Sequence, residues 1–323
     1  MIGCGSTTYT DPDDYRLNVA GATIKLVRTG GGPFRARLTW VNTRRLSLLL
    51  VDEAGPRVAS VSLAPTSAFV SFPLRGDPLP VWSGVEVRRG DIVLHGRGDS
   101  FHQRTAGTTR WGLISLTWKD LAAYGRALLG VELVPPRAAK FLRPPPGAMA
   151  DILRLHTQAC RLARTRPDMI AHREVVRALE QDLIHALINC LTADEARERA
   201  DTRQRHAETM ARFERVLALQ GDRQLPMSEL CAGAGVPERT LRMCCADFLG
   251  MSPTGYARLR RLNLVRSALL RNSPTTTTIG TLAREYGFSE LGRFAAAYRA
   301  AFGESPSTTL QGGPSNVFAV RTA

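Results

Sequence analysis

Lysine is the residue type that this sequence most clearly lacks. Of its 43 basic residues only three are lysines (Lys25, Lys119 and Lys140), and 29 acidic residues leave a formal charge of +14. A surplus of positive charge favours an acidic partner such as nucleic acid. A composition rich in arginine and alanine is also typical of GC-rich genomes. The charge alone therefore does not identify the partner.

Long apolar runs are absent as well. The longest, 46–51 and 183–191, are far shorter than the roughly 20 residues that a membrane-spanning helix needs. The first residues, Met1 to Cys4, have neither the basic region nor the apolar segment of a secretory leader. We therefore expect a cytoplasmic protein with no membrane partner.

Motifs for metal binding and catalysis are also missing. The six cysteines show no CxxC or Cys/His spacing, which favours reduced, packed thiols over disulfides or zinc. A redox sensor at Cys244-Cys245 is the alternative. There is no nucleophile elbow, phosphate loop or HExxH sequence. The sequence thus predicts that the protein is not an enzyme and uses no cofactor or metal.

The length and the residue patterns predict an α+β protein with several domains. Residues 1–118 contain short runs of valine, leucine and aromatic residues separated by turn residues, which is typical of a β-sandwich or barrel. The runs that we expect to be strands are 46–51, 58–63, 68–72, 85–87, 91–94 and 113–118.

Residues 119–202 have a helical pattern. Helices are expected near 119–130, 148–165 and 168–196, with a proline-rich break at 143–147. The third has apolar residues at helical spacing, which predicts either a partner-binding or dimer surface, or packing against the sandwich. The charged stretch 194–205 predicts a solvated helix end or a linker to a second domain at 203–311, and 312–323 form a tail.

An internal repeat is the most informative feature of the sequence. Residues Leu241, Cys245, Gly250, Ser252 and Pro253 recur 53 positions later, as Phe294, Tyr298, Gly303, Ser305 and Pro306. Upstream the offset is 52, so one residue is inserted in the second turn. The chain therefore contains two copies of one structural unit.

Each copy has the pattern of a helix-turn-helix. In the first copy, Ser228 is expected to cap a helix, Gly235 to form the turn, and Pro237 to occupy the first position of a helix ending at Leu249. In the second copy, we expect Thr278 to cap a helix that runs to Tyr286, Gly287 to form the turn, and a second helix to span 289–302.

The second helix of each unit has an apolar stripe and an opposite face turned by about 200°. The stripes are Leu241, Cys244, Cys245 and Phe248 in the first copy, and Phe294, Ala297, Tyr298 and Ala301 in the second. Arg239 and Arg242 lie on the opposite face of the first copy. Arginine there can read guanine in the major groove, whereas the second copy has almost no hydrogen-bonding group on that face.

A third helix is expected between the two units. Residues 254–270 form an amphipathic stretch of about 25 Å, surrounded by Arg258, Arg260, Arg261 and Arg266. With the widths of the flanking helices, this spacing approaches the roughly 34 Å of one DNA turn. We therefore predict that one chain enters two successive major grooves.

These residues, above all Gly287-Phe288-Ser289, Tyr298-Arg299 and Ser305-Pro306, resemble the second helix-turn-helix of AraC-family transcription regulators. The resemblance covers about 210–310 and implies a seven-helix DNA-binding domain. It places base-contacting positions at Arg239, Arg242, Met243, Leu291, Gly292 and Ala296. The predicted contacts with the DNA backbone are Ser228, Thr240, Arg258, Thr278, Arg293 and Arg299. Two departures from the family pattern are Pro237 at the cap and Ala296 where the family commonly has arginine.

The N-terminal part is similar to the cupin-like sensor domains of the same family. The similarity rests on Gly90-Asp91 and Leu94, followed by Gly98 and His102. Residues 111–116 and 303–307 resemble the ethanolamine-operon activators. The aromatic and imidazole side chains that we expect to line an effector pocket are Trp40, Phe72, Trp82, His102 and Trp111, although core packing is an alternative for most of them. His95 and His102 alone do not form a metal-ligand cluster.

These patterns together predict a ligand-responsive transcription activator. Its expected partners are double-stranded promoter or operator DNA, RNA polymerase and a small-molecule effector, and a homodimer is left open. The alternatives are a cupin-type enzyme with an appended DNA-binding domain and a constitutive regulator that binds no ligand.

Overall fold

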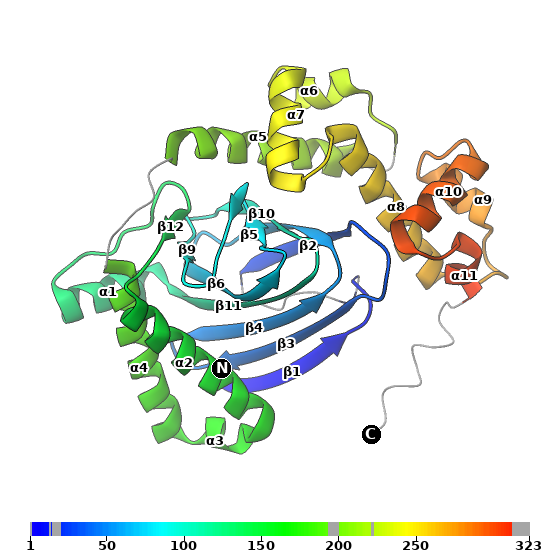
Figure 1. Ribbon diagram of the computed structural model, residues 1–323. Helices are drawn as coiled ribbons and strands as arrows, with labels where there is room; N and C mark the ends of the chain where they lie inside the picture. The colour runs from blue at the N-terminus through cyan, green and yellow to red at the C-terminus, as the bar shows by residue number, and fades with distance from the viewer. Residues whose placement is uncertain (1, 13, 15–20, 193–199, 221–222, 312–323) are drawn as a thin grey trace.

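The computed structural model describes residues 2–12, 14, 21–192, 200–220 and 223–311. An N-terminal β domain carries four helices on one side, and a helical domain follows it (Figure 1). No helix of the described residues is long and apolar enough to span a membrane.

Two antiparallel sheets form the β domain. The order of strands is β1-β3-β4-β11-β6-β9-β12 in the first sheet and β2-β5-β10-β7-β8 in the second. The strands are β1 (Gly3–Tyr9), β2 (Ala22–Arg28), β3 (Arg35–Asn42), β4 (Ser47–Ala54), β5 (Arg57–Leu63), β6 (Ser67–Asp77), β7 (Val81–Trp82), β8 (Val85–Glu86), β9 (Ile92–Leu94), β10 (Ser100–Thr105), β11 (Thr108–Thr117) and β12 (Lys140–Leu142).

The six predicted runs all overlap strands, and the strands that they omit are mostly those with mixed polar and apolar residues. One prediction is wrong in kind, because β12 lies in the region expected to be helical. It pairs antiparallel with β9, Lys140 opposite Leu94 and Leu142 opposite Ile92. An edge strand of three residues is too short to leave a periodicity in the sequence.

Four helices cover the seven-stranded sheet, the first three in contact with its strands and the fourth packed on those three (Figure 1). They are α1 (Trp118–Leu129), α2 (Pro146–Thr165), α3 (Pro167–Ala171) and α4 (Arg173–Thr192). The side chains of Val176, Leu183, Leu187 and Leu191 on α4 are buried in the same core cluster as Val70 of the sheet. The apolar stripe of this helix therefore packs within the N-terminal domain, mainly against α1, α2 and α3.

The helical domain contains α5 (Ala200–Leu219), α6 (Met227–Ala234), α7 (Glu238–Leu249), α8 (Pro253–Arg271), α9 (Ile279–Glu285), α10 (Leu291–Phe302) and α11 (Pro306–Gln311). It has two separate cores. One contains residues of α5, α6 and α7, and the other contains residues of α9, α10 and α11. In Figure 1, α6 and α7 lie at one end of α8, and α9 to α11 lie at the other.

His156 of α2 is a fully buried imidazole in the core between α2 and the sheet. Its Nε2 lies 3.1 Å from the carbonyl oxygen of Leu49, and its ring meets the edge of Phe72 at a centroid distance of 5.1 Å. Burial lowers the pKa of His156 to about 4. The folded protein therefore holds this imidazole neutral.

The buried imidazole predicts a loss of stability in mild acid. An unfolded histidine has a pKa of about 6.5, so the unfolded chain binds more protons than the folded protein between pH 6.5 and about pH 4. The free energy of unfolding therefore falls by about 3 kcal/mol as the pH is lowered across this range. In His156→Gln the side-chain amide can still donate to Leu49. We expect the free energy of unfolding of this variant to fall by about 3 kcal/mol less than that of the wild type between pH 7 and pH 4. Urea unfolding, monitored by tryptophan fluorescence, measures the stability of the wild type and of the variant at each pH. An equal dependence of stability on pH in the two proteins would contradict a neutral, buried His156.

Candidate nucleic-acid interface

The first helix-turn-helix consists of α6 and α7. Gly235 ends α6 with a left-handed φ of 67°, which glycine adopts without steric strain. The predicted cap Ser228 is wrong in position, and Pro237 is the N-cap residue of α7 and not its first helical residue. Pro226 precedes α6 and Pro237 precedes α7, both with extended backbone and no side-chain hydrogen bond, so Ser228 lies inside the first turn of α6. A proline restricted in φ begins each of these helices in place of a side-chain cap.

The second helix of this unit, α7, has the two faces that its spacing predicts. On one face, four side chains are at most 2% exposed: Leu241, Cys244, Cys245 and Phe248. Arg239, Arg242 and Ala246 are exposed, and Met243 is 46% exposed. This outward face therefore carries two arginines and a methionine, while the predicted backbone contact Thr240 is half-buried.

Arg242 has an internal partner. Its guanidinium lies 2.7 Å from Glu238 one turn earlier, and both side chains are about half exposed. An exposed pair of this kind contributes only about 0.3–0.5 kcal/mol. Glu238 therefore orients Arg242 without preventing it from turning to another acceptor.

The second helix-turn-helix consists of α9 and α10. Thr278 caps α9 as predicted, with its hydroxyl accepting from the Thr281 backbone N–H at 3.1 Å, and Gly287 forms the turn with φ 74°. The second helix begins at Leu291 and not at Ser289, because Glu290 is its extended N-cap residue. Phe294 and Tyr298 are buried, whereas Ala297 and Ala301 are only partly buried.

The outward face of α10 is poor in polar groups. Leu291 is 37% exposed, Gly292 and Ala296 are exposed, and Arg299 also faces solvent. Arg293 is 81% exposed and forms an ion pair with Glu290 at 3.1 Å. The other predicted backbone contacts, Ser228, Arg258 and Thr278, are exposed as well.

Three of the four arginines expected to surround α8 are engaged inside the protein. Arg260 pairs with Glu214 at 3.0 Å and Arg266 with Glu304 at 3.3 Å. Arg261 is buried and donates to the carbonyl oxygens of two residues at the turn of the second unit, at 3.2 and 3.0 Å. Of this group, only Arg258 is exposed. Three of the four arginines around α8 are therefore held by acceptors that lie 25 to 46 residues away in the sequence.

Glu214 of α5 joins the β domain to the helical domain. Its carboxylate accepts from His102 of β10 at 3.1 Å, from the Tyr256 hydroxyl at 2.6 Å and from Arg260 at 3.0 Å. Burial by itself raises the pKa of Glu214, but the hydrogen bonds from His102 and Tyr256 and the charges of His102 and Arg260 outweigh it, so the net pKa is lowered. This acceptor was not predicted, and its only sequence signal is its position beside the apolar residue Phe213.

A second contact connects the β domain to α8. The side-chain amide of Asn263 accepts from the backbone N–H of Arg28 at 3.0 Å and donates to its carbonyl oxygen at 3.2 Å. β2 is an edge strand, and the Asn263 amide pairs with both backbone groups of Arg28, as a residue of a neighbouring strand would. The glycine turn after β2 also approaches the second unit, since a Cβ atom at Gly31 would lie 3.3 Å from the backbone nitrogen of Gly303.

The five residues expected to line an effector pocket do not lie together. Phe72 is in the core under the helices, Trp82 and Trp111 are in the core between the sheets, and Trp40 is 37% exposed. His102 lines a cavity of about 280 Å³, but this cavity lies between the β domain and α5. The three buried aromatic rings serve core packing, the alternative that the sequence left open.

All six cysteines are free thiols, and Cys244 and Cys245 are both buried. Burial raises the pKa of Cys160 and of Cys190 to about 12 and also raises that of Cys245. Thiols with raised pKa values are poor nucleophiles, which favours core packing over the redox alternative. In the described part of the chain, no three His, Cys, Asp or Glu side chains are placed to hold a metal ion.

The C-terminal part of the chain is similar to known proteins. Residues 230–312 match the family model described as a helix-turn-helix domain. The XylDLEGF operon transcriptional activator of Pseudomonas putida is 37% identical over 102 residues, which are 31% of this chain and 32% of that protein. XylDLEGF operon transcriptional activator 2 of the same organism is 37% identical over 101 residues, 30% of this chain and 64% of its own length.

A solved structure, the AraC-like transcriptional activator CuxR, is 14% identical with a TM-score of 0.41, and the match covers 81% of this chain and 95% of that one. The match to the curated relatives spans about a third to two thirds of their length. The helix-turn-helix match and the activator relatives define a DNA-binding domain of the class found in transcription regulators. More particularly, the chain contains a helix-turn-helix domain at residues 230–312.

Proposed function

We propose that this protein is a sequence-specific transcription activator that reads two successive major grooves and responds to a small molecule. The observation that carries the proposal is the outward face of α7, where Arg239, Arg242 and Met243 are exposed opposite a fully buried stripe. Arginine at such positions can donate two hydrogen bonds to guanine. The XylDLEGF relatives, which are transcriptional activators, support the assignment of activation.

The arrangement of the two units supports binding in two grooves. The helix α8 that joins them has 19 residues, which is about 28 Å of helix. With the widths of α7 and α10 added, this approaches the roughly 34 Å of one DNA turn. Base reading falls mainly to α7, and α10 contributes shape and contacts with the DNA backbone, because its exposed face is Leu291, Gly292 and Ala296.

The contacts between the domains support a response to a ligand. The β domain touches α5 and α8 through Glu214 and Asn263, so a change in the β domain reaches both helix-turn-helix units. As an activator in the cytoplasm, the protein would bind RNA polymerase. Association into a homodimer is part of the same proposal.

Substitution of Arg239 or Arg242 by alanine tests the base-reading role. We expect each substitution to cost about 1–3 kcal/mol of specific affinity, because one bidentate contact with a base is lost. The measurement is a competition assay at fixed salt between a genomic fragment selected by the wild-type protein and random DNA of the same length.

Arg161→Ala is a matched control, since this exposed arginine lies on α2 of the N-terminal domain. Arg161→Ala should leave the affinity for the selected fragment and the affinity for random DNA unchanged. An unaltered ratio of specific to random binding in the Arg239 and Arg242 variants would contradict the assignment of base reading to α7.

A further inference from the structure

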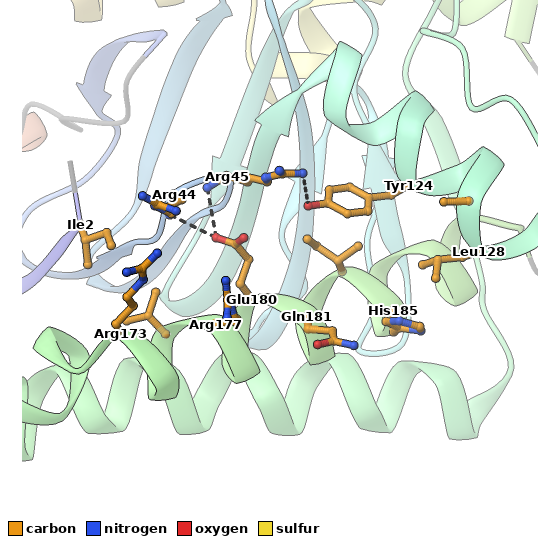
Figure 2. Close-up of a pocket in the computed structure, with 13 residues that line it drawn as sticks. Ile2, Arg44, Arg45, Tyr124, Leu128, Arg173, Arg177, Glu180, Gln181 and His185 are labelled. Carbon is orange, nitrogen blue, oxygen red and sulfur yellow. Dashed lines mark hydrogen bonds between the residues drawn. The ribbon is translucent and has the colours of Figure 1, made fainter.

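A cleft with a basic end lies on the N-terminal domain, outside the sheets and away from both helix-turn-helix units. It has a volume of about 460 Å³ and lies between α1 and α4, bounded by Ile2 and by the turn between β3 and β4. Figure 2 shows Arg44, Arg173 and Arg177 around one end of the cleft, and Tyr124 and Leu128 toward the other. The cleft is thus cationic at one end and apolar at the other.

The charge at the basic end is only partly balanced within the protein. Glu180 is the one acidic residue of the lining, and it already accepts from the backbone N–H groups of Arg44 and Arg45, each at 3.1 Å. Within the described ranges, the guanidinium groups of Arg44, Arg173 and Arg177 have no carboxylate at ion-pair distance. Several cations grouped around one concave surface repel each other, and a bound anion relieves this repulsion.

The opposite end offers an ordered apolar surface. Tyr124 is fixed by Arg45, whose guanidinium donates to its hydroxyl at 2.7 Å and lies 5.5 Å from the centre of its ring. This hydrogen bond raises the pKa of Arg45, so its guanidinium stays protonated and positively charged. Leu128 and the buried Ile184 complete the apolar lining.

We propose that this cleft binds an amphipathic acid, a small molecule with a carboxylate or phosphate head on an apolar body. The head would lie among Arg44, Arg173 and Arg177, and the body would extend toward Tyr124, Leu128 and Ile184. Arginine matches the bidentate geometry of both head groups. A volume of about 460 Å³ is within the range of small-molecule sites, and a concave cleft suits such a ligand better than a flat protein surface does.

A role of this ligand as the effector rests on the proposed function. The cleft is lined by α4, which is the last described helix before α5, and α5 carries Glu214 at the contact between the domains. Binding on α4 is therefore close along the chain to the helix that joins the domains.

Isothermal titration calorimetry of the full chain with decanoate and with decyl phosphate tests the site without DNA. We expect saturable binding of one molecule per chain to at least one of the two, and the better ligand identifies the head group. Decanol and inorganic phosphate, which each lack one half of the ligand, should bind at least tenfold more weakly. Inorganic phosphate binding as tightly as decyl phosphate, or no binding of either acid, would overturn the proposal.

Two variants remove the two properties of the cleft separately. Arg173→Gln combined with Arg177→Gln should weaken binding at least tenfold, because charge-assisted hydrogen bonds are lost. Ala127→Trp keeps the charge and fills the cleft, and it should weaken binding as strongly. The matched control is Arg161→Gln with Arg164→Gln, two exposed arginines of α2, which should change the affinity less than twofold.

A DNA-binding assay with and without the better acid separates this proposal from the proposed function. Calorimetric binding that the arginine variant abolishes supports the site whatever the DNA assay shows. An unchanged affinity for DNA would then count against the ligand response alone.

Discussion

Replacement of Glu214 by alanine is expected to destabilise the protein by about 3–5 kcal/mol, as the removal of one partner from a buried ion pair does. The carboxylate is only 13% exposed and accepts from three groups that belong to β10 and α8. Without it, the buried Tyr256 hydroxyl and the largely buried guanidinium of Arg260 lose their acceptor. Urea unfolding followed by far-UV circular dichroism at pH 7 measures the loss.

Two further variants make this prediction specific. Glu214→Gln keeps one acceptor oxygen and should lose less than the alanine variant. Glu208→Ala, on the exposed side of the same helix, should change the stability by less than about 0.5 kcal/mol. A Glu214→Ala variant as stable as this control would show that the carboxylate does not connect the two domains.

The lowered pKa of Glu214 also sets the direction of a pH effect. Because the folded pKa lies below the usual glutamate value of about 4.3, the stabilisation is fully present above that pH and is lost as the pH falls through the folded pKa. The wild type should therefore lose stability relative to Glu214→Gln only in this acid range. His156 acts at higher pH, between about 6.5 and 4, so the two effects can be separated.

Replacement of Arg261 by methionine is expected to loosen the second helix-turn-helix, at a cost of about 2–6 kcal/mol. Arg261 satisfies the partly buried carbonyl oxygens of Tyr286 and Gly287, and each acceptor left without a donor costs roughly 1–3 kcal/mol. Its guanidinium also lies 4.7 Å from the ring centre of Phe288, and methionine replaces only the packing part of that contact.

Hydrogen exchange of the intact protein measures this effect where it occurs. Amides of α9 and α10 should exchange faster in Arg261→Met, whereas those of α6 and α7, which have their own core, should be unchanged. Arg258→Met is the control, since Arg258 is exposed three residues earlier on the same helix. Equal protection of α10 in both variants would contradict a structural role for Arg261.

The features that depend on local spacing could be predicted from the amino-acid sequence alone. The turns at Gly235 and Gly287, the cap at Thr278 and the buried stripe of α7 follow from residues within one or two helical turns of each other. The long connecting helix could be predicted because a period of 3.6 residues shows directly in the chain, and the repeat because similar residues recur 53 positions apart.

Which polar side chains are exposed and free to bind a ligand depends on the tertiary fold. Arg239 and Arg261 look alike as arginines of amphipathic helices, but one is exposed and the other is buried against a turn 25 residues away. His102 was expected in an effector pocket, and it instead meets Glu214, 112 residues further along the chain. Ion pairs, buried acceptors and the cleft between α1 and α4 all depend on partners brought together by folding, and a local pattern carries no information about such partners.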